Sequence, residues 1–224
     1  MAAPLRVCYG GTFDPIHNAH LAIACGVRDA FNVPVHLLPA ADPPHRAPPG
    51  ATAAQRAAMV ALAIAGQPGL VLDERELVRA RARPQQPSYT VDTLAELRAE
   101  LGPQQPLAWV IGGDSLAGLT TWHRWQALFE LAHIIVVARP GSPLPPDLSS
   151  ALQACVRGGG WTAGPARLAQ LPAGCLLALP LPLQTGSATA VRRAIAAGQA
   201  IDGLVPPAVA GYLAQHRLYR VHGA

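Results

Sequence analysis

The sequence predicts an α/β fold with a mostly parallel sheet and helices on both of its faces. Short apolar runs that end at Gly or Pro alternate with segments of helical spacing along the 224 residues. Strands that alternate with helices in this way are typical of right-handed βαβ units, which build a parallel sheet. Half of the residues are apolar, which is enough for a sizeable core.

The apolar runs predict five strands, at 5–9, 33–39, 107–111, 134–138 and 176–179. Helical spacing predicts six helices, at 18–31, 52–65, 90–101, 122–132, 187–197 and 207–216, with Thr52 as an N-cap. Residues 140–174 are rich in Pro and Gly and have weak periodicity, so we interpret them as a peripheral elaboration. We therefore expect a single domain that spans residues 1–224.

The charged residues favour small anionic ligands as partners. The formal net charge is +4, and the basic residues are scattered rather than grouped into a track for nucleic acid. All 17 of them are arginine, since the chain contains no lysine. This excludes a P-loop of the GK[ST] type and any chemistry through a lysine Schiff base or lysyl-adenylate.

The remaining bulk features predict a cytoplasmic protein. The four cysteines, Cys8, Cys25, Cys155 and Cys175, are widely spaced and form no C-x-x-C pair, which favours free thiols. We expect no signal peptide, because Gly10, Gly11 and Asp14 interrupt the first apolar run early. No apolar run approaches the ~20 residues that a membrane span needs.

The loop after the first strand carries the first candidate site. Gly10, Gly11, Thr12 and Phe13 precede the helix at 18–31, and paired glycines let backbone N–H groups approach a phosphate. His17 and His20 are three residues apart and share a face at the positive end of that helix. The alternatives are that the histidines only cap the helix, or that they bind zinc, although no third ligand is evident.

A second candidate site lies near the other end of the chain. Ser187 and Thr189 place hydroxyls at a helix N-terminus, and Arg192 follows within the first turns. A guanidinium there is suited to grip a triphosphate and to neutralise charge as pyrophosphate leaves. An ordinary capped helix with an exposed arginine is the competing interpretation.

Two further loops carry candidate ligands. His45 and Arg46 follow the second strand and are able to reach phosphate, with an ordinary surface turn as the alternative. Gly112, Asp114 and Ser115 follow the strand at 107–111, where a carboxylate is able to accept both ribose hydroxyls of an adenosine. For Asp114, a plain helix N-cap is the competing explanation.

These segments together resemble the motifs of the nucleotidyltransferase superfamily. Residues 11–20 resemble its G-[TS]-F-D-P-x-H-x-G-H signature, with Ala19 at the place of the last Gly. Residues 186–192 are similar to its I-S-S-T-x-[IV]-R motif, with Gly186 and Ala188 at the places of Ile and the second Ser. The resemblance implies a Rossmann-like nucleotidyltransferase fold.

Two intermediate segments narrow the resemblance to the nicotinate mononucleotide adenylyltransferases. In that family, segments similar to Ser88-Tyr89-Thr90 and Thr121-Trp122 form the pyridine pocket. The resemblance implies that Trp122 stacks on the ring and that backbone N–H groups around Thr90 and His123 bind the carboxylate. Core packing is the alternative for both Trp122 and Trp125; we accept it for Trp125 alone.

The resemblance implies transfer of AMP from ATP to nicotinate mononucleotide, with release of pyrophosphate. It further implies Mg²⁺ on the ATP oxygens, for which we can name no protein ligand. A nicotinamide-mononucleotide or phosphopantetheine adenylyltransferase is the nearest alternative, and a nucleotide-binding regulator without catalysis is the alternative from another class. Neither nucleic acid nor membrane is an expected partner, and the sequence leaves open whether the chain is a monomer or a homodimer.

Overall fold

The computed structural model describes residues 4–41, 50–138, 143–182 and 185–220. Its centre is a sheet of six strands in the order β3-β2-β1-β4-β5-β6, and all five strand pairs are parallel. The strands are β1 (Arg6–Gly11), β2 (Val35–Pro39), β3 (Leu70–Leu72), β4 (Leu107–Gly112), β5 (His133–Val137) and β6 (Leu176–Leu179). The predicted α/β class with a parallel sheet is confirmed.

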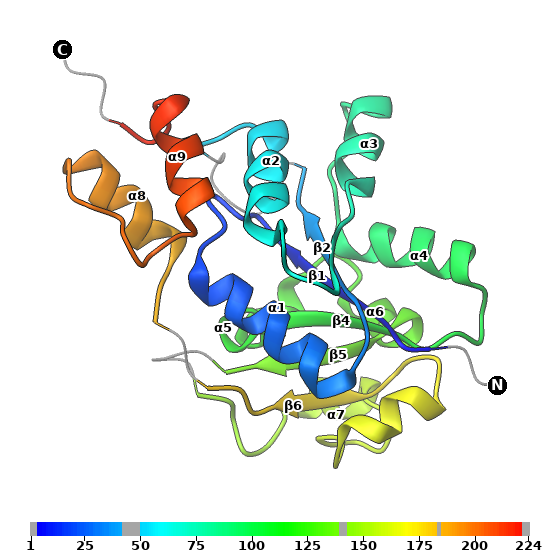
Figure 1. Cartoon of the computed structure of the whole chain (residues 1–224). Helices are drawn as coiled ribbons and strands as arrows, with labels where there is room; N and C mark the ends of the chain where they lie inside the picture. Colours follow the sequence, from blue (N-terminus) through cyan, green and yellow to red (C-terminus); the bar gives the residue numbers. More distant parts are fainter. Residues whose placement is uncertain (1–3, 42–49, 139–142, 183–184, 221–224) are drawn as a thin grey trace.

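Helices connect these strands and cover the sheet (Figure 1). The α-helices are α1 (Asn18–Phe31), α2 (Ala53–Ile64), α3 (Arg75–Ala82), α4 (Thr90–Leu101), α5 (Gly113–Ala117), α6 (Trp125–Leu131), α7 (Ser150–Cys155), α8 (Ala188–Ala196) and α9 (Pro207–Gln215). Two short 3₁₀ segments, η1 (Leu119–Thr121) and η2 (Pro165–Gln170), complete the described elements.

The core consists of two apolar clusters, one on each face of the sheet. Alternate residues of each strand point to opposite faces, so Val7 of β1 joins one cluster and Cys8 joins the other. The first cluster contains side chains of α1, α2, α8 and α9, whereas the second contains side chains of α4, α6 and α7. Both faces of the sheet are therefore buried, as a parallel sheet requires.

The structure corrects several predicted boundaries. Gly10 and Gly11 belong to β1 and pair with β2, so the strand continues past the predicted end at residue 9. The helix predicted at 122–132 begins only at Trp125, because Arg124 adopts a left-handed backbone. No predicted element corresponds to β3, α3, α5 or α7. Thr52 is confirmed as the N-cap of α2, where its hydroxyl accepts from the Gln55 N–H.

The described part of the Pro- and Gly-rich segment packs on the core. Leu148, Leu152 and Val156 join the cluster on one face of the sheet, and Leu168 joins the other. The segment holds α7 and η2 and leads into β6 at the edge of the sheet. It lies on the side of the molecule away from α2 and α9 (Figure 1).

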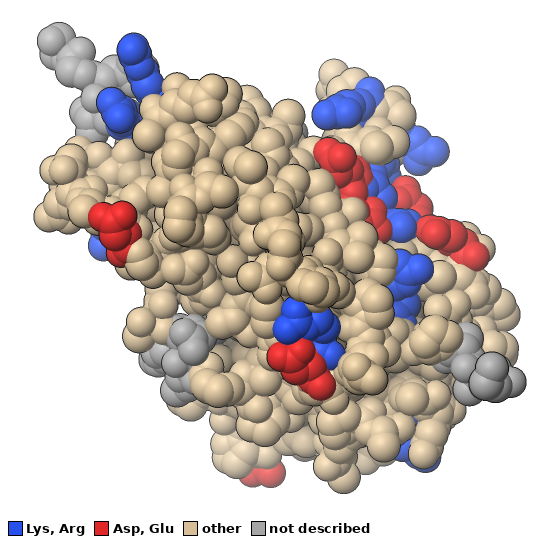
Figure 2. Space-filling model, viewed as in Figure 1, with Lys and Arg blue, Asp and Glu red and all other residues tan. Residues whose placement is uncertain are grey.

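The surface carries charges of both signs in small groups. On the face shown in Figure 2, most atoms are uncharged, and acidic and basic side chains lie side by side around α3 and α4. Ion pairs there join Arg75 to Glu100 at 3.0 Å and Arg79 to Glu96 at 2.7 Å. Among the described residues, no helix combines the length and apolar character needed to cross a membrane.

Candidate active site

A cavity of about 710 Å³ opens at the carboxyl ends of β1 and β4. The strand order reverses between these two neighbours, with β2 and β3 on one side and β5 and β6 on the other. Open parallel sheets bind ligands at such a switch point. The lining residues are Tyr9, Gly10, Gly11, Thr12, Phe13, Asp14, His17, His20, Ala40, Gly50, Glu76, Ser88, Thr90, Trp109, Ile111, Gly112, Asp114, Ser115, Trp122, Ser187, Ala188, Thr189 and Arg192.

The two glycines at the end of β1 leave room for aromatic rings. A Cβ on Gly10 would lie 2.1 Å from Cζ2 of Trp109, and one on Gly11 would lie 2.9 Å from Cζ of Phe13. Neither glycine is among the residues with positive φ. The glycines are needed because the Trp109 and Phe13 rings occupy the space above the strand.

The two predicted histidines lie together at the start of α1. His17 is the N-cap, and its backbone N–H donates to Nδ1 of His20 at 3.3 Å. The two rings are stacked, with centroids 3.7 Å apart. Because Nδ1 of His20 accepts a hydrogen bond, a neutral ring carries its proton on Nε2, which is the nitrogen that can donate to a ligand. Phe13 packs edge-on against His20 at 5.1 Å and so limits the movement of this ring.

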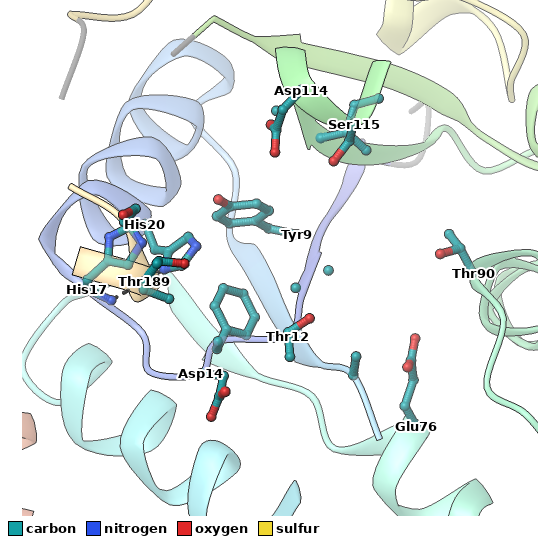
Figure 3. A pocket seen from close by; sticks show the side chains of 18 of the residues that line it. Tyr9, Thr12, Asp14, His17, His20, Glu76, Thr90, Asp114, Ser115 and Thr189 are labelled. Carbon is teal, nitrogen blue, oxygen red and sulfur yellow. Dashed lines mark hydrogen bonds between the residues drawn. The ribbon is translucent and has the colours of Figure 1, made fainter. Parts of the chain in front are cut away.

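The start of α8 lies beside the histidines in the wall of the cavity (Figure 3). Ser187 is its N-cap and accepts from the Ala190 N–H at 3.1 Å, which is the capping role that the competing interpretation gave it. Arg192 donates from Nη1 to the Asp14 carbonyl oxygen at 2.6 Å and from Nη2 to Thr189 Oγ1 at 3.3 Å. Its side chain is 35% exposed and lines the cavity, so it is an anchored cation that a ligand can still reach.

The two departures from the superfamily motifs meet in space. A Cβ on Gly186 would lie 3.6 Å from Cβ of Ala19 and 3.7 Å from Nδ1 of His17. Gly186 has φ +139, a backbone conformation that residues with a side chain rarely adopt. The chain therefore places its extra methyl group, on Ala19, beside a position that has no side chain.

The N-terminus of α4 forms the opposite end of the cavity (Figure 3). Tyr89 is the N-cap and makes no side-chain capping hydrogen bond. The first N–H groups of a helix have no partner within the helix and carry partial positive charge. Thr90, the first residue of α4, lines the cavity, so this end is suited to a carboxylate.

The buried carboxyl group of Glu76 stabilises the N-terminal end of α4 through a hydrogen-bond network. Its two oxygens accept from Thr93 Oγ1 at 2.8 Å and from Ser88 Oγ at 3.0 Å. Arg79 donates to the same two hydroxyls, at 2.7 and 2.8 Å. Burial raises the pKa of Glu76, against the lowering effect of these hydrogen bonds and of Arg79. This network fixes the approach to α4, since Ser88 lies two residues before it.

The tryptophans differ in their access to the cavity. Trp122 and Trp125 both pack partly against the core cluster, but of the two only Trp122 lines the cavity. Trp122 precedes α6 in an extended backbone conformation, so it lies in a loop rather than in a helix. The exposed ring of His123 stacks on Tyr89 with centroids 4.2 Å apart, and His123 is not among the residues that line the cavity.

The loop after β4 supplies the carboxylate expected for a ribose. Asp114 and Ser115 line the cavity beside the histidines and Thr90 (Figure 3). Gly112 is the N-cap of α5, and Asp114 lies within the first turn of that helix. The plain N-cap explanation for Asp114 is therefore wrong.

Arg56 of α2 is a fully buried cation that ties two of the site's loops together. Its guanidinium donates to the carbonyl oxygens of Thr12 at 2.7 Å, Ala40 at 2.5 Å and Ala51 at 3.3 Å, and also to that of Ala41. Thr12 follows β1 and Ala40 follows β2, so one side chain joins the carboxyl ends of two strands. No pattern in the sequence indicated a role for Arg56.

The cavity wall also contains residues that were not predicted as site residues, among them Tyr9, Asp14, Glu76 and Trp109. Asp14 and Tyr9 lie within or beside the first motif, whereas Glu76 lies in a charged stretch without a distinctive spacing. His45 and Arg46 lie outside the described residues. In the part of the chain that the structure describes, no three His, Cys, Asp or Glu side chains are grouped to hold a metal ion.

Comparisons with known proteins show the family of the chain. A family model described as cytidylyltransferase-like matches residues 8–194. The probable nicotinate-nucleotide adenylyltransferase of Stenotrophomonas maltophilia (strain K279a) is 58% identical over 216 residues, which cover 96% of this chain and 97% of that protein. The probable nicotinate-nucleotide adenylyltransferase of Laribacter hongkongensis (strain HLHK9) is 47% identical over 218 residues, with coverages of 95% and 93%.

A solved structure with low sequence identity shares the fold. The nicotinic acid mononucleotide adenylyltransferase of Plasmodium falciparum, complexed with NaAD, matches with a TM-score of 0.71 at 16% identity and covers 96% of this chain and 97% of that one. The family match spans most of the chain, and the curated relatives match it from end to end. The chain therefore belongs to the cytidylyltransferase-like family and, within it, to the nicotinate-nucleotide adenylyltransferases.

Proposed function

We propose that this chain transfers AMP from ATP to nicotinate mononucleotide, which yields nicotinate adenine dinucleotide and pyrophosphate in NAD biosynthesis. The observation that carries the proposal is one cavity of about 710 Å³ that contains a histidine pair, an anchored arginine, a ribose-type carboxylate and a helix N-terminus beside a tryptophan. Its volume lies within the range of cavities that bind nucleotide-sized ligands. The relatives at 58% and 47% identity support the same activity.

In the proposed reaction, a phosphate oxygen of nicotinate mononucleotide attacks the α-phosphorus of ATP. A new P–O bond forms while the bond between that phosphorus and the oxygen of pyrophosphate breaks. A phosphate dianion needs no general base, so the protein aligns the two substrates and stabilises charge. His17 and His20 donate to the α-phosphate, and Arg192 binds the β- and γ-phosphates as they leave.

The remaining assigned residues hold the rest of the substrates. Gly10 to Phe13, with Ser187 and Thr189, line the phosphate path, while Gly112, Asp114 and Ser115 bind the adenosine ribose. Trp122 stacks on the pyridine ring, and the backbone N–H groups at Thr90 and His123 bind its carboxylate. For His45 and Arg46, which lie outside the described residues, the sequence motif alone supports a role in phosphate binding.

Mg²⁺ would enter with the ATP substrate and would offset part of the negative charge of its phosphates. The described residues offer no cluster of ligands for a resident metal ion, so no step is assigned to a protein-bound metal. The proposed place of action is the cytoplasm, where ATP and the mononucleotide are available.

Selectivity for acid over amide tests the proposal. Nicotinate presents a charged carboxylate to the N–H groups of α4, whereas nicotinamide turns an NH₂ donor toward them. Hydrogen bonds to charged groups contribute ~1.5–3 kcal/mol, and an unpaired buried donor costs about as much. We therefore expect at least a ~100-fold preference for the acid in kcat/KM, which a pocket based on hydrogen bonds can reach.

The assay measures pyrophosphate release with ATP and each mononucleotide. Trp122→Ala serves as the control, because the loss of stacking should weaken both substrates similarly. Comparable kcat/KM values for acid and amide would refute the nicotinate assignment. A wild-type chain that released no pyrophosphate with either acceptor would refute the adenylyl transfer itself.

A further inference from the structure

The carboxylate of Asp14 joins three segments that are far apart in the sequence. Asp14 follows β1 in the cavity wall and is only 7% exposed. Its Oδ2 accepts from the Gly50 N–H at 2.9 Å, and its Oδ1 accepts from the Ala51 N–H at 3.1 Å. The hydroxyl of Tyr219, beyond α9, donates to Oδ1 at 2.6 Å. Three donors therefore hold the carboxylate in one orientation.

Arg192 contacts Asp14 mainly through the backbone. Its Nη1 lies 2.6 Å from the Asp14 carbonyl oxygen but 3.7 Å from the nearest carboxylate oxygen, Oδ2. The arginine is thus oriented by a neutral carbonyl group, while the negative charge beside it is engaged by other donors. A close pair with the carboxylate would instead offset the charge that a polyphosphate needs.

Tyr219 is built into this arrangement. Its ring lies against Gly50, where an added Cβ would be 2.8 Å from Cε1 of the ring. Burial, followed by the hydrogen bond to Asp14, raises the pKa of Tyr219 well above its ordinary value, so the phenol stays protonated and donates a hydrogen bond to the Asp14 carboxylate. The residue also adopts a left-handed backbone, with φ 61, which is uncommon for an aromatic residue.

We propose that Tyr219 is a positioning residue for ATP. Its hydroxyl holds the carboxylate of Asp14 away from a close pair with Arg192 and so leaves the guanidinium available to the phosphates. The inference rests on the proposed function, because it takes Arg192 as a ligand of the β- and γ-phosphates. The competing explanation is that Tyr219 only anchors the end of the chain to the loop before α2.

The variant Tyr219→Phe separates these explanations, because it removes one oxygen atom and keeps the ring against Gly50. Without the hydroxyl, the carboxylate loses one of its three donors and turns toward Arg192. We expect the KM for ATP, and the Kd for a non-hydrolysable ATP analogue, to rise about three- to tenfold. The KM for nicotinate mononucleotide should stay within about twofold of wild type. The matched control is Tyr212→Phe on α9, which should change neither constant.

A second pair of variants tests the route through Asp14. In an Asp14→Asn background no carboxylate competes for Arg192, so adding Tyr219→Phe should change the Kd for the ATP analogue by less than about twofold. An undiminished effect of Tyr219→Phe in that background would overturn the proposal. The proposal would also be overturned if Tyr219→Phe lowered the melting temperature but left the Kd for the ATP analogue unchanged. Equal weakening of the binding of both substrates by Tyr219→Phe would overturn it as well.

The binding measurement also keeps this inference separate from the proposed function. A wild-type chain that binds the ATP analogue but forms no dinucleotide contradicts the proposed function, and Tyr219 is then still judged by the change in Kd. If the wild-type chain forms the dinucleotide but Tyr219→Phe leaves the Kd for the ATP analogue unchanged, only the role given to Tyr219 is contradicted. If Tyr219→Phe does not fold, Asp14→Asn alone should lower the Kd for the ATP analogue, and a higher Kd would overturn the proposal.

Discussion

Replacement of Arg56 by Met should destabilise the protein strongly, because it removes the cation but keeps most of the side chain's volume. The guanidinium is fully buried and donates to four carbonyl oxygens. Loss of one partner from such a buried charged network costs about 3–5 kcal/mol. For a chain of this length, each kcal/mol corresponds to roughly 2–4 °C in Tm. We therefore expect Tm to fall by about 6–20 °C.

The variant Arg56→Lys should also lower the stability, but by less than Arg56→Met. An ammonium group has three donors and a single centre, so Arg56→Lys keeps the charge but leaves at least one of the four carbonyls without its donor. We expect it to cost about 1.5–3 kcal/mol, the contribution of one charged hydrogen bond. The order of stability should therefore be wild type, then Arg56→Lys, then Arg56→Met.

Thermal and urea unfolding measure these differences, and kcat per folded molecule is measured well below the lowest Tm. Arg81→Met on α3 is the matched control, because Arg81 is exposed and its replacement should change stability by no more than about 0.5 kcal/mol. A Tm for Arg56→Met within 2–4 °C of wild type, or about 1 kcal/mol, would refute the view that this cation holds the two loops together.

Two more predictions address a phosphate ligand and a buried acid. His20→Ala should lower kcat by ~100-fold with little change in Tm, because one donor to the charged transition state is lost; a variant with more than half of wild-type activity would contradict the role. Glu76 has a raised pKa, so its ionisation costs stability. The free energy of unfolding of wild type should therefore fall, relative to that of Glu76→Gln, as the pH rises from the ordinary carboxyl pKa to the raised one. Urea unfolding of both proteins between about pH 4.5 and 8 measures the difference, and parallel curves would contradict the prediction.

The elements that the sequence predicted are those with a long or strongly apolar pattern. The runs at β4 and β5 are buried along their whole length, and α1 has its buried residues on one face, so periodicity was sufficient. By contrast, β3 has only three residues at the edge of the sheet, and Val71 at its centre is 40% exposed. Its pairing with β2 stabilises it, and no local pattern records that pairing.

The same distinction holds for the site. Residues that lie close together in sequence, such as His17 and His20, could be assigned because helix geometry alone places them on one face. Glu76 lies in α3, whose sequence is rich in arginine, so the sequence pattern around it is that of a solvent-exposed helix. It is buried because the following segment packs against it, and the hydroxyls of Ser88 and Thr93 from that segment donate hydrogen bonds to its carboxylate. Tyr219 meets Asp14 across 205 positions, a contact that a single sequence cannot reveal.

The absence of lysine has a structural counterpart in arginines that each bind several backbone carbonyls. Arg56 and Arg98 each donate to four backbone carbonyls: Arg98 joins those of Gly102, Gln105, Leu131 and Pro172. An ammonium cannot span four acceptors, so lysine could not replace either residue without a loss. Arg192 uses the same planar group differently, because it is anchored by Asp14 and Thr189 yet remains open to the cavity. Arg56 and Arg98 therefore hold the backbone, whereas Arg192 also lines the cavity, so substitutions should lower stability at Arg56 and Arg98 and turnover at Arg192.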